Sequence, residues 1–279
     1  MNEMSATPTA EQWRALTLIE RINFKVTSRI NQSPVLRRPM TVFQSKFYKW
    51  WVELGTSKIV LDHGFENFKK IDPQKGVLLV VNHRTFYDQF VVAARLFRLY
   101  GAHHNIYFPI RANFFYDNPL GLFINIPFSM GAMYPPFVRD AKRRRWNQYA
   151  TDLLVELLCN PENMVGFHPE GTRNQGPDPY ALLPAKPGCG ELIYRSNPNV
   201  VPVFLQGFKS AWFMFRQNLG NSAPPKPLVH MVMGEPLDFS AELTREPGNK
   251  TYLLISRKVM EVIHQLAQRE RAIRAQYET

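Results

Sequence analysis

A histidine and an aspartate five residues apart form the first pair in this sequence that could do acid–base chemistry. His83 and Asp88 follow residues 77–81, an apolar run rich in β-branched side chains that is typical of a buried strand. On one continuous helix this separation would point the two side chains about 140° apart. They can meet only if His83 lies in a loop and Asp88 in the first turn of the next helix. The carboxylate would then hold one imidazole nitrogen and leave the other as a base.

A second segment, Pro-Glu-Gly-Thr-Arg at residues 169–173, has the residue types of an anion-binding loop. Gly171 and Thr172 can turn backbone N–H groups toward an anion, and Arg173 can hold a phosphate through two parallel hydrogen bonds. Glu170 is suited to accept a hydrogen bond from a substrate hydroxyl or from a neighbouring arginine. Arg139, just past an apolar run, is a second phosphate candidate. The alternative is a surface turn whose arginine is solvated.

The surroundings of His83 favour direct attack by a substrate hydroxyl. No serine or cysteine beside the His83/Asp88 pair is an evident nucleophile. The simplest mechanism therefore has His83 deprotonate a hydroxyl that attacks an acyl carbonyl. We expect no metal, because His103 and His104 have no carboxylate near them in the sequence. His168 is expected to be structural.

The elements that would position these residues alternate along the chain. Strands are predicted at residues 77–81, 164–167, 200–205 and 228–233, and helices at 88–99, 146–158, 191–195 and 251–272. Alternation of this kind predicts an α/β fold, with a mixed, mostly parallel sheet flanked by helices. Both candidate segments follow predicted strands. They should therefore meet at the carboxyl edge of the sheet, where open α/β sheets bind ligands.

Residues 1–63 are predicted to form a separate N-terminal helical hairpin, and residues 64–279 the α/β domain. Apolar residues recur at helical spacing in both halves of the hairpin, with breaks expected at residues 31–34 and 37–39. The second half combines aromatic residues with Lys46 and Lys49, which suits a membrane surface. The alternative is that the hairpin packs on the main domain.

Composition points to an anionic partner and a reducing compartment. The net charge is +11, and the only cysteines are Cys159 and Cys189, which give no disulfide framework. The longest uncharged run, residues 118–138, contains four prolines, so it cannot form a regular spanning helix. The charge alone does not choose among a phospholipid surface, a nucleic acid and a phosphorylated substrate. We expect a cytoplasmic protein that associates peripherally with the inner face of a membrane, with no nucleic acid as partner.

Four blocks in a fixed order resemble the acyltransferases of glycerophospholipid synthesis, which acylate glycerol-3-phosphate or 1-acylglycerol-3-phosphate. The blocks are the Asn-His-x4-Asp segment at 82–88, a middle block at 131–139 ending in arginine, Pro-Glu-Gly-Thr-Arg at 169–173, and Val-Val-Pro-Val at 200–203. His168 stands where that family usually has an aromatic residue. The similarity runs from about residue 64 to residue 237.

The resemblance implies a role for each candidate residue. His83 would be the general base and Asp88 its orienting carboxylate. The remaining candidates would bind the phosphorylated glycerolipid acceptor: Arg139, Glu170, Gly171, Thr172 and Arg173. The donor would be acyl-CoA or acyl carrier protein as co-substrate, with no other cofactor, and an apolar tunnel would hold the acyl chain. An intact Glu-Gly-Thr-Arg favours a 1-acylglycerol-3-phosphate acceptor.

Other functions remain open at this point. The acceptor could be glycerol-3-phosphate or another lysolipid or glycolipid. A degenerate fold could be a non-catalytic basic protein that binds lipid or nucleic acid, and a metal or an activated water could make the chain a hydrolase. Acyl chain length, donor and oligomeric state do not follow from the sequence.

Overall fold

The computed structural model describes residues 7–43, 45–46, 49–100, 104–129, 131–208, 215–218 and 229–278. Within these residues, six strands form one sheet in the order β1-β8-β7-β2-β6-β3. Their bounds are β1 Val60–His63, β2 Val77–Val81, β3 Asn105–Tyr107, β6 Asn163–Phe167, β7 Asn199–Gln206 and β8 Val229–Met233. Neighbouring strands run parallel except for the antiparallel pair β7 and β8. The predicted mixed, mostly parallel sheet is confirmed.

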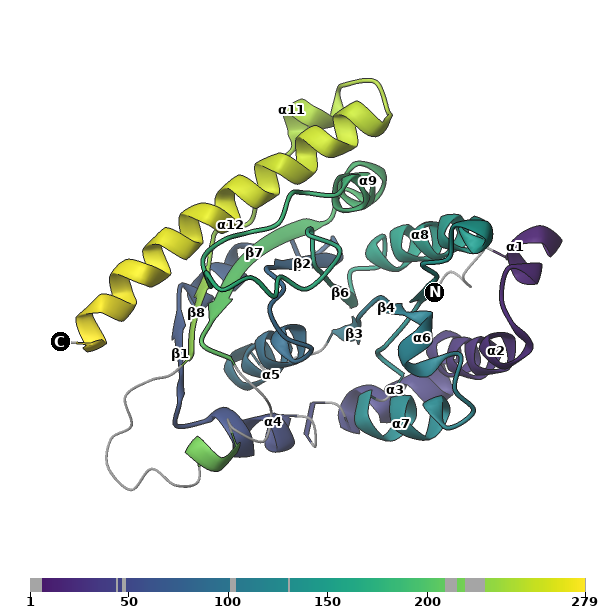
Figure 1. Ribbon diagram of the computed structural model, residues 1–279, viewed down its shortest axis with the longest axis horizontal. Helices are drawn as coiled ribbons and strands as arrows, with labels where there is room; N and C mark the ends of the chain where they lie inside the picture. The colour runs from purple at the N-terminus through teal and green to yellow at the C-terminus, as the bar shows by residue number, and fades with distance from the viewer. Residues whose placement is uncertain are drawn as a thin grey trace.

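Helices cover both faces of this sheet, which explains why its central strand is apolar at every position. Figure 1 shows α8 (Arg145–Leu158), α9 (Pro187–Ser196) and α12 (Asn249–Glu278) on one side, and α5 (Asp88–Tyr100) on the other. Alternate residues of β2 belong to the two cores, with Leu78 and Val80 facing one and Leu79 and Val81 the other. The predicted strands and helices are all present, with bounds shifted by a few residues; Leu228, the predicted start of the last strand, lies outside the described residues.

The remaining elements of the main domain are short. They are β4 (Ile110–Arg111), β5 (Pro136–Phe137), α6 (Ala112–Phe115), α7 (Gly121–Ser129), α11 (Ser240–Leu243) and the 3-10 helices η2 (Phe65–Lys70) and η3 (Ala141–Arg143). The proline-rich stretch after Asn118 contains the nine-residue helix α7, despite Pro127. Among the described residues, no helix has the length and apolar character that crossing a bilayer requires.

The N-terminal region comprises α1 (Ala10–Arg14), α2 (Leu18–Gln32), α3 (Pro34–Phe43) and α4 (Lys49–Thr56). The break expected at residues 37–39 is wrong, because α3 continues through Pro39. Tertiary contacts of the buried Arg37 outweigh the proline: its guanidinium donates to the Ile106 carbonyl at 3.1 Å and lies over the Tyr107 ring at 4.6 Å. These contacts fix α3 on the main sheet.

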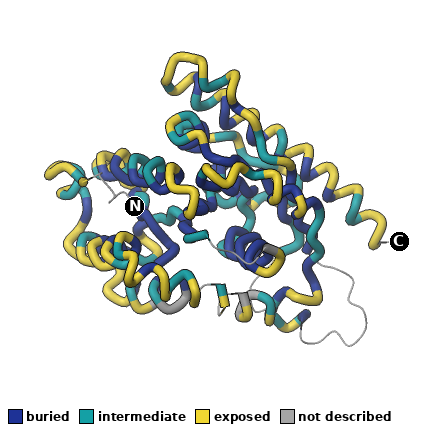
Figure 2. Tube along the Cα trace, turned by 180° about the vertical axis from the view of Figure 1, so that it is seen from behind, coloured by how far each residue is buried: buried dark blue, intermediate teal, exposed yellow. Residues whose placement is uncertain are grey.

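Helix α2 packs on the main domain through its polar face. Asn23 Nδ2 donates to the Tyr116 carbonyl at 2.9 Å, Asn31 Nδ2 donates to the Gly131 carbonyl at 3.0 Å, and the buried Glu20 pairs with Arg143. Phe24 is the apolar residue of α2 that is buried in the core, whereas Leu18, Ile19, Ile22 and Val26 are exposed. Figure 2 shows exposed residues along the outer side of the N-terminal helices. Strand β1, placed by the sequence analysis in the N-terminal region, belongs to the main sheet.

Candidate active site

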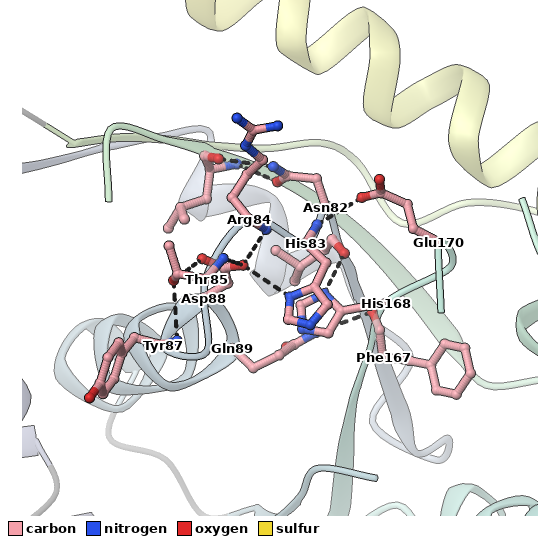
Figure 3. Close-up of polar contacts among 12 residues, drawn as sticks. Asn82, His83, Arg84, Thr85, Tyr87, Asp88, Gln89, Phe167, His168 and Glu170 are labelled. Carbon is pink, nitrogen blue, oxygen red and sulfur yellow. Dashed lines mark hydrogen bonds and ion pairs between the residues drawn. The ribbon is translucent and has the colours of Figure 1, made fainter. Parts of the chain in front are cut away.

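His83 and Asp88 meet beyond the carboxyl end of β2, in the strand–loop–helix arrangement that their spacing requires (Figure 3). Nδ1 of His83 lies 3.2 Å from Oδ2 of Asp88, which is the first residue of α5. The Asp88 side chain is fully buried, whereas that of His83 is 19% exposed. Because Nδ1 faces the carboxylate, Nε2 of His83 is left as the nitrogen that can take a proton.

The loop between the two residues wraps around the Asp88 carboxylate. Oδ2 accepts hydrogen bonds from the backbone N–H groups of Arg84 and Thr85 at 2.7 and 2.8 Å, and Oδ1 accepts from the Thr85 hydroxyl at 2.6 Å. These donors stabilise a buried carboxylate that would otherwise be costly to ionise. They also fix its orientation toward His83.

The loop carrying Glu170 clamps the His83 peptide from both sides. Oε1 of Glu170 accepts from the His83 backbone N–H at 2.8 Å, and the Asn174 N–H donates to the His83 carbonyl at 2.8 Å. Oε2 of Glu170 accepts from the Leu183 N–H at 2.8 Å. Burial raises the pKa of Glu170, and the two amide donors oppose that rise. The structure thus places Glu170 against the backbone of the base and not in the lining of the cavity described below.

Two further side chains tie this loop to the sheet. The fully buried amide of Asn82 pairs with the backbone of Leu205 on β7, donating to the carbonyl at 3.0 Å and accepting from the N–H at 2.8 Å. His168, which follows β6, lies parallel to the ring of His83 with the ring centroids 3.7 Å apart. The sequence analysis treated His168 as structural; no pattern in the sequence indicated this contact.

Three arginines from separate segments gather around Thr172. The Thr172 hydroxyl oxygen accepts from Nη2 of Arg111 at 2.9 Å and from Nη2 of Arg139 at 3.3 Å. Burial lowers the pKa of Arg111, and the charges of Arg139 and Arg173 lower it further. In the described parts of the chain, none of the three is ion-paired with a carboxylate. Sequence reasoning selected Arg139, Thr172 and Arg173 but missed Arg111, which opens the aromatic segment at residues 111–116.

One cavity of about 320 Å³ joins the base to the cations. His83, Arg111, Arg139, Gly171 and Arg173 all line it. The rest of its wall is largely aromatic and apolar, with Phe86, Phe90, Phe108, Phe114, Met133 and Phe137. A cavity with a base, a cationic cluster and an apolar wall suits a molecule that has an anionic group and a hydrocarbon chain.

His83, Asp88 and His168 also form a cluster whose possible ligand atoms lie within 4.8 Å of one another. The two rings are nearly parallel, at an interplanar angle of 13°, so their in-plane lone pairs do not converge on one point. Nδ1 of His168 is moreover 2.8 Å from the Val81 carbonyl, to which it donates. This donor set does not fit the tetrahedral convergence that zinc requires. His103, considered in the sequence, lies outside the described residues.

Comparison with known proteins agrees with the chemistry of this cavity. The family model described as Acyltransferase matches residues 60–206, just over half of the chain. The match runs from β1 to the end of β7 and contains all the residues that line the cavity. Among curated proteins, no match to the chain was found.

Proposed function

Because the chain belongs to the acyltransferase family, we propose that it moves a fatty acyl group from acyl-CoA or acyl carrier protein to a hydroxyl of a lysophospholipid, most simply 1-acylglycerol-3-phosphate. One observation carries this proposal: the same cavity is lined by a carboxylate-oriented histidine and by three arginines without carboxylate partners among the described residues. A phosphate monoester on the acceptor would supply the missing negative charge. The aromatic wall would hold hydrocarbon.

The proposed reaction uses His83 first as a base and then as an acid. Nε2 takes the proton of the acceptor hydroxyl while the hydroxyl oxygen attacks the thioester carbonyl. The tetrahedral intermediate then expels the thiolate, and the imidazolium returns the proton to give the free thiol and the new ester. Asp88 keeps Nδ1 protonated and stabilises the positive charge on His83 during the first step. General-base catalysis of this kind contributes about 10²–10⁴-fold to the rate.

A panel of acceptors tests the proposal. The purified protein is incubated with acyl-CoA or acyl carrier protein donors and with glycerol-3-phosphate, 1-acylglycerol-3-phosphate or phosphate-free lysolipids, and the products are read by mass spectrometry. We expect an ester on a phosphorylated acceptor, and none with folded His83→Ala. Release of thiol without an ester would identify a hydrolase, and lipid binding without either product a non-catalytic protein.

We also propose that an anionic membrane surface is a partner, bound by the outward face of α2. Leu18 and Ile22 on this face are 71% and 51% exposed. Residues 18–46 contain a single acidic side chain, the buried Glu20, whereas Lys25, Arg29, Arg38 and Lys46 are exposed. Each basic residue near an anionic bilayer contributes about 1 kcal/mol. Apolar and basic side chains without exposed acids are typical of an interfacial helix.

Co-sedimentation with vesicles tests this surface. Leu18→Glu should weaken binding to phosphatidylserine-containing vesicles by about tenfold, since it removes an apolar contact and adds a negative charge. Leu254→Glu, at a 38% exposed position of α12, is the matched control and should bind as the unaltered protein does. Equal binding by Leu18→Glu and the control would rule out α2 as the contact.

A further inference from the structure

A second imidazole lies flat against the proposed base. The rings of His83 and His168 have centroids 3.7 Å apart and an interplanar angle of 13°, and both side chains line the cavity (Figure 3). The two residues follow neighbouring parallel strands, with Val80 of β2 in register with Phe167 of β6. The sheet itself therefore brings the rings together. One face of His83 is covered by a flat side chain of matching size.

His168 is held rigidly by the main chain. Its Nδ1 donates to the carbonyl of Val81, the last residue of β2, at 2.8 Å. Burial first, and the charge of the neighbouring His83 second, lower the pKa of His168 to about 3. The ring is thus neutral at any ordinary working pH, with the proton on Nδ1. A base this weak cannot replace His83, and a neutral ring does not repel the positive charge that His83 acquires.

We propose that His168 is a positioning residue for His83, which holds its ring with Nδ1 on Asp88 and stabilises the imidazolium through an aromatic face. This inference rests on the proposed role of His83 as general base. Three groups then surround the imidazole: the carboxylate at its Nδ1 edge, the His168 ring on one face, and the substrate at Nε2. A cation over an aromatic face gains about 0.5–2 kcal/mol, which corresponds to about 2- to 30-fold in rate. A flat aromatic side chain is sufficient for both effects.

Three substitutions at position 168 separate the aromatic face from mere filling of space. His168→Phe keeps a flat ring, His168→Leu keeps an apolar side chain without one, and His168→Ala removes both. We expect kcat within about threefold of the unaltered protein for His168→Phe, and about tenfold lower for the other two, with the KM for the acceptor unchanged in all three. A kcat for His168→Leu equal to that of His168→Phe would overturn the proposal. So would a His168→Phe protein as impaired as His168→Ala while still folded.

Imidazole ¹⁵N NMR tests the arrangement without any assay of activity. Between pH 5 and 8, His168 should show the shifts of a neutral ring protonated on Nδ1, and replacing His168 by Phe should leave the Nδ1 proton of His83 in place. Titration of His168 in this range would overturn the proposal. Failure of the proposed function is distinguishable, because the unaltered protein would then transfer no acyl group while the NMR result would still report on the stack.

Discussion

The two polar parts of the cavity are built in opposite ways. Around His83, the polar contacts are made by protein groups. Asp88 contacts Nδ1 of the ring, Glu170 accepts from the backbone N–H, and Asn174 donates to the backbone carbonyl. Around Thr172, three guanidinium groups gather and none is ion-paired with a carboxylate in the described residues. We call the first the braced part, because protein groups hold His83 in place. We call the second the cationic part, because its positive charges lack a carboxylate partner among the described residues.

This difference separates a group that must keep its geometry from groups that must attract a ligand. A base needs a fixed orientation before the substrate arrives, so its neighbours are protein groups. Cations placed together lower one another's affinity for protons and favour any anion that enters between them. The braced part should therefore control the rate of the chemical step, and the cationic part the affinity for the acceptor.

The largest effect is expected at the braced part, from Asp88→Asn. An amide at this position carries no negative charge, so it cannot stabilise the imidazolium as the carboxylate does, although its oxygen can still accept from the backbone N–H groups of Arg84 and Thr85. We expect kcat to fall by about 10³-fold with little change in KM. Steady-state kinetics with circular dichroism as the folding control would measure this. A rise in KM at constant kcat would break the proposed division of roles.

The cationic part should give the next largest effect, through affinity. Arg173→Ala and Arg111→Ala should each raise the acceptor KM by about 10- to 100-fold, because charge-assisted hydrogen bonds to phosphate are lost. Neither change should lower the melting temperature, since each removes repulsion within the cluster. A phosphate-free lysolipid serves as the control acceptor. An equal loss with that acceptor would show that the arginines do not recognise phosphate.

Glu170 gives a smaller effect and the sharpest test of the boundary between the two parts. The resemblance implied that Glu170 binds the acceptor, whereas its two oxygens accept from the backbone of His83 and Leu183. In Glu170→Gln, the side-chain NH₂ must face one of these N–H donors. We expect kcat to fall by about tenfold and KM to stay constant. The opposite pattern, a higher KM at constant kcat, would return Glu170 to acceptor binding.

Local sequence predicted the parts of the site that depend on local geometry. The strand–loop–helix around His83 and Asp88 was predicted from their five-residue spacing after an apolar strand. The position of the site at the carboxyl edge of the sheet was predicted from the alternation of strands and helices. Arg111 and His168 were missed because their partners, Thr172 and His83, are distant in the sequence and only the tertiary structure brings them together. The sequence analysis also missed that α2 packs on the main domain through polar side chains, and the reason is the same. Its buried polar side chains bond to carbonyls almost 100 residues away, as Asn23 does with Tyr116.

The smallest expected effect is on the free energy of unfolding, and it tests whether the His168 ring is neutral in the folded protein. The pKa of His168 is about 3 in the folded protein, against about 6.5 for an unfolded histidine. Between these values the unfolded state binds a proton that the folded state does not, so stability rises with pH and is lost as pH falls below about 6.5.

His168→Phe removes this pH-dependent contribution to stability. Between pH 7 and pH 5 its free energy of unfolding should therefore fall less than that of the unaltered protein, by up to about 2 kcal/mol. Urea unfolding of the two proteins at both pH values measures the difference. His264→Phe, at an exposed histidine of α12, is the control for the replacement of one histidine by phenylalanine. An equal fall in the free energy of unfolding for His168→Phe and the unaltered protein would mean that His168 binds protons alike in the folded and unfolded states. The ring that covers His83 would then be able to carry a charge.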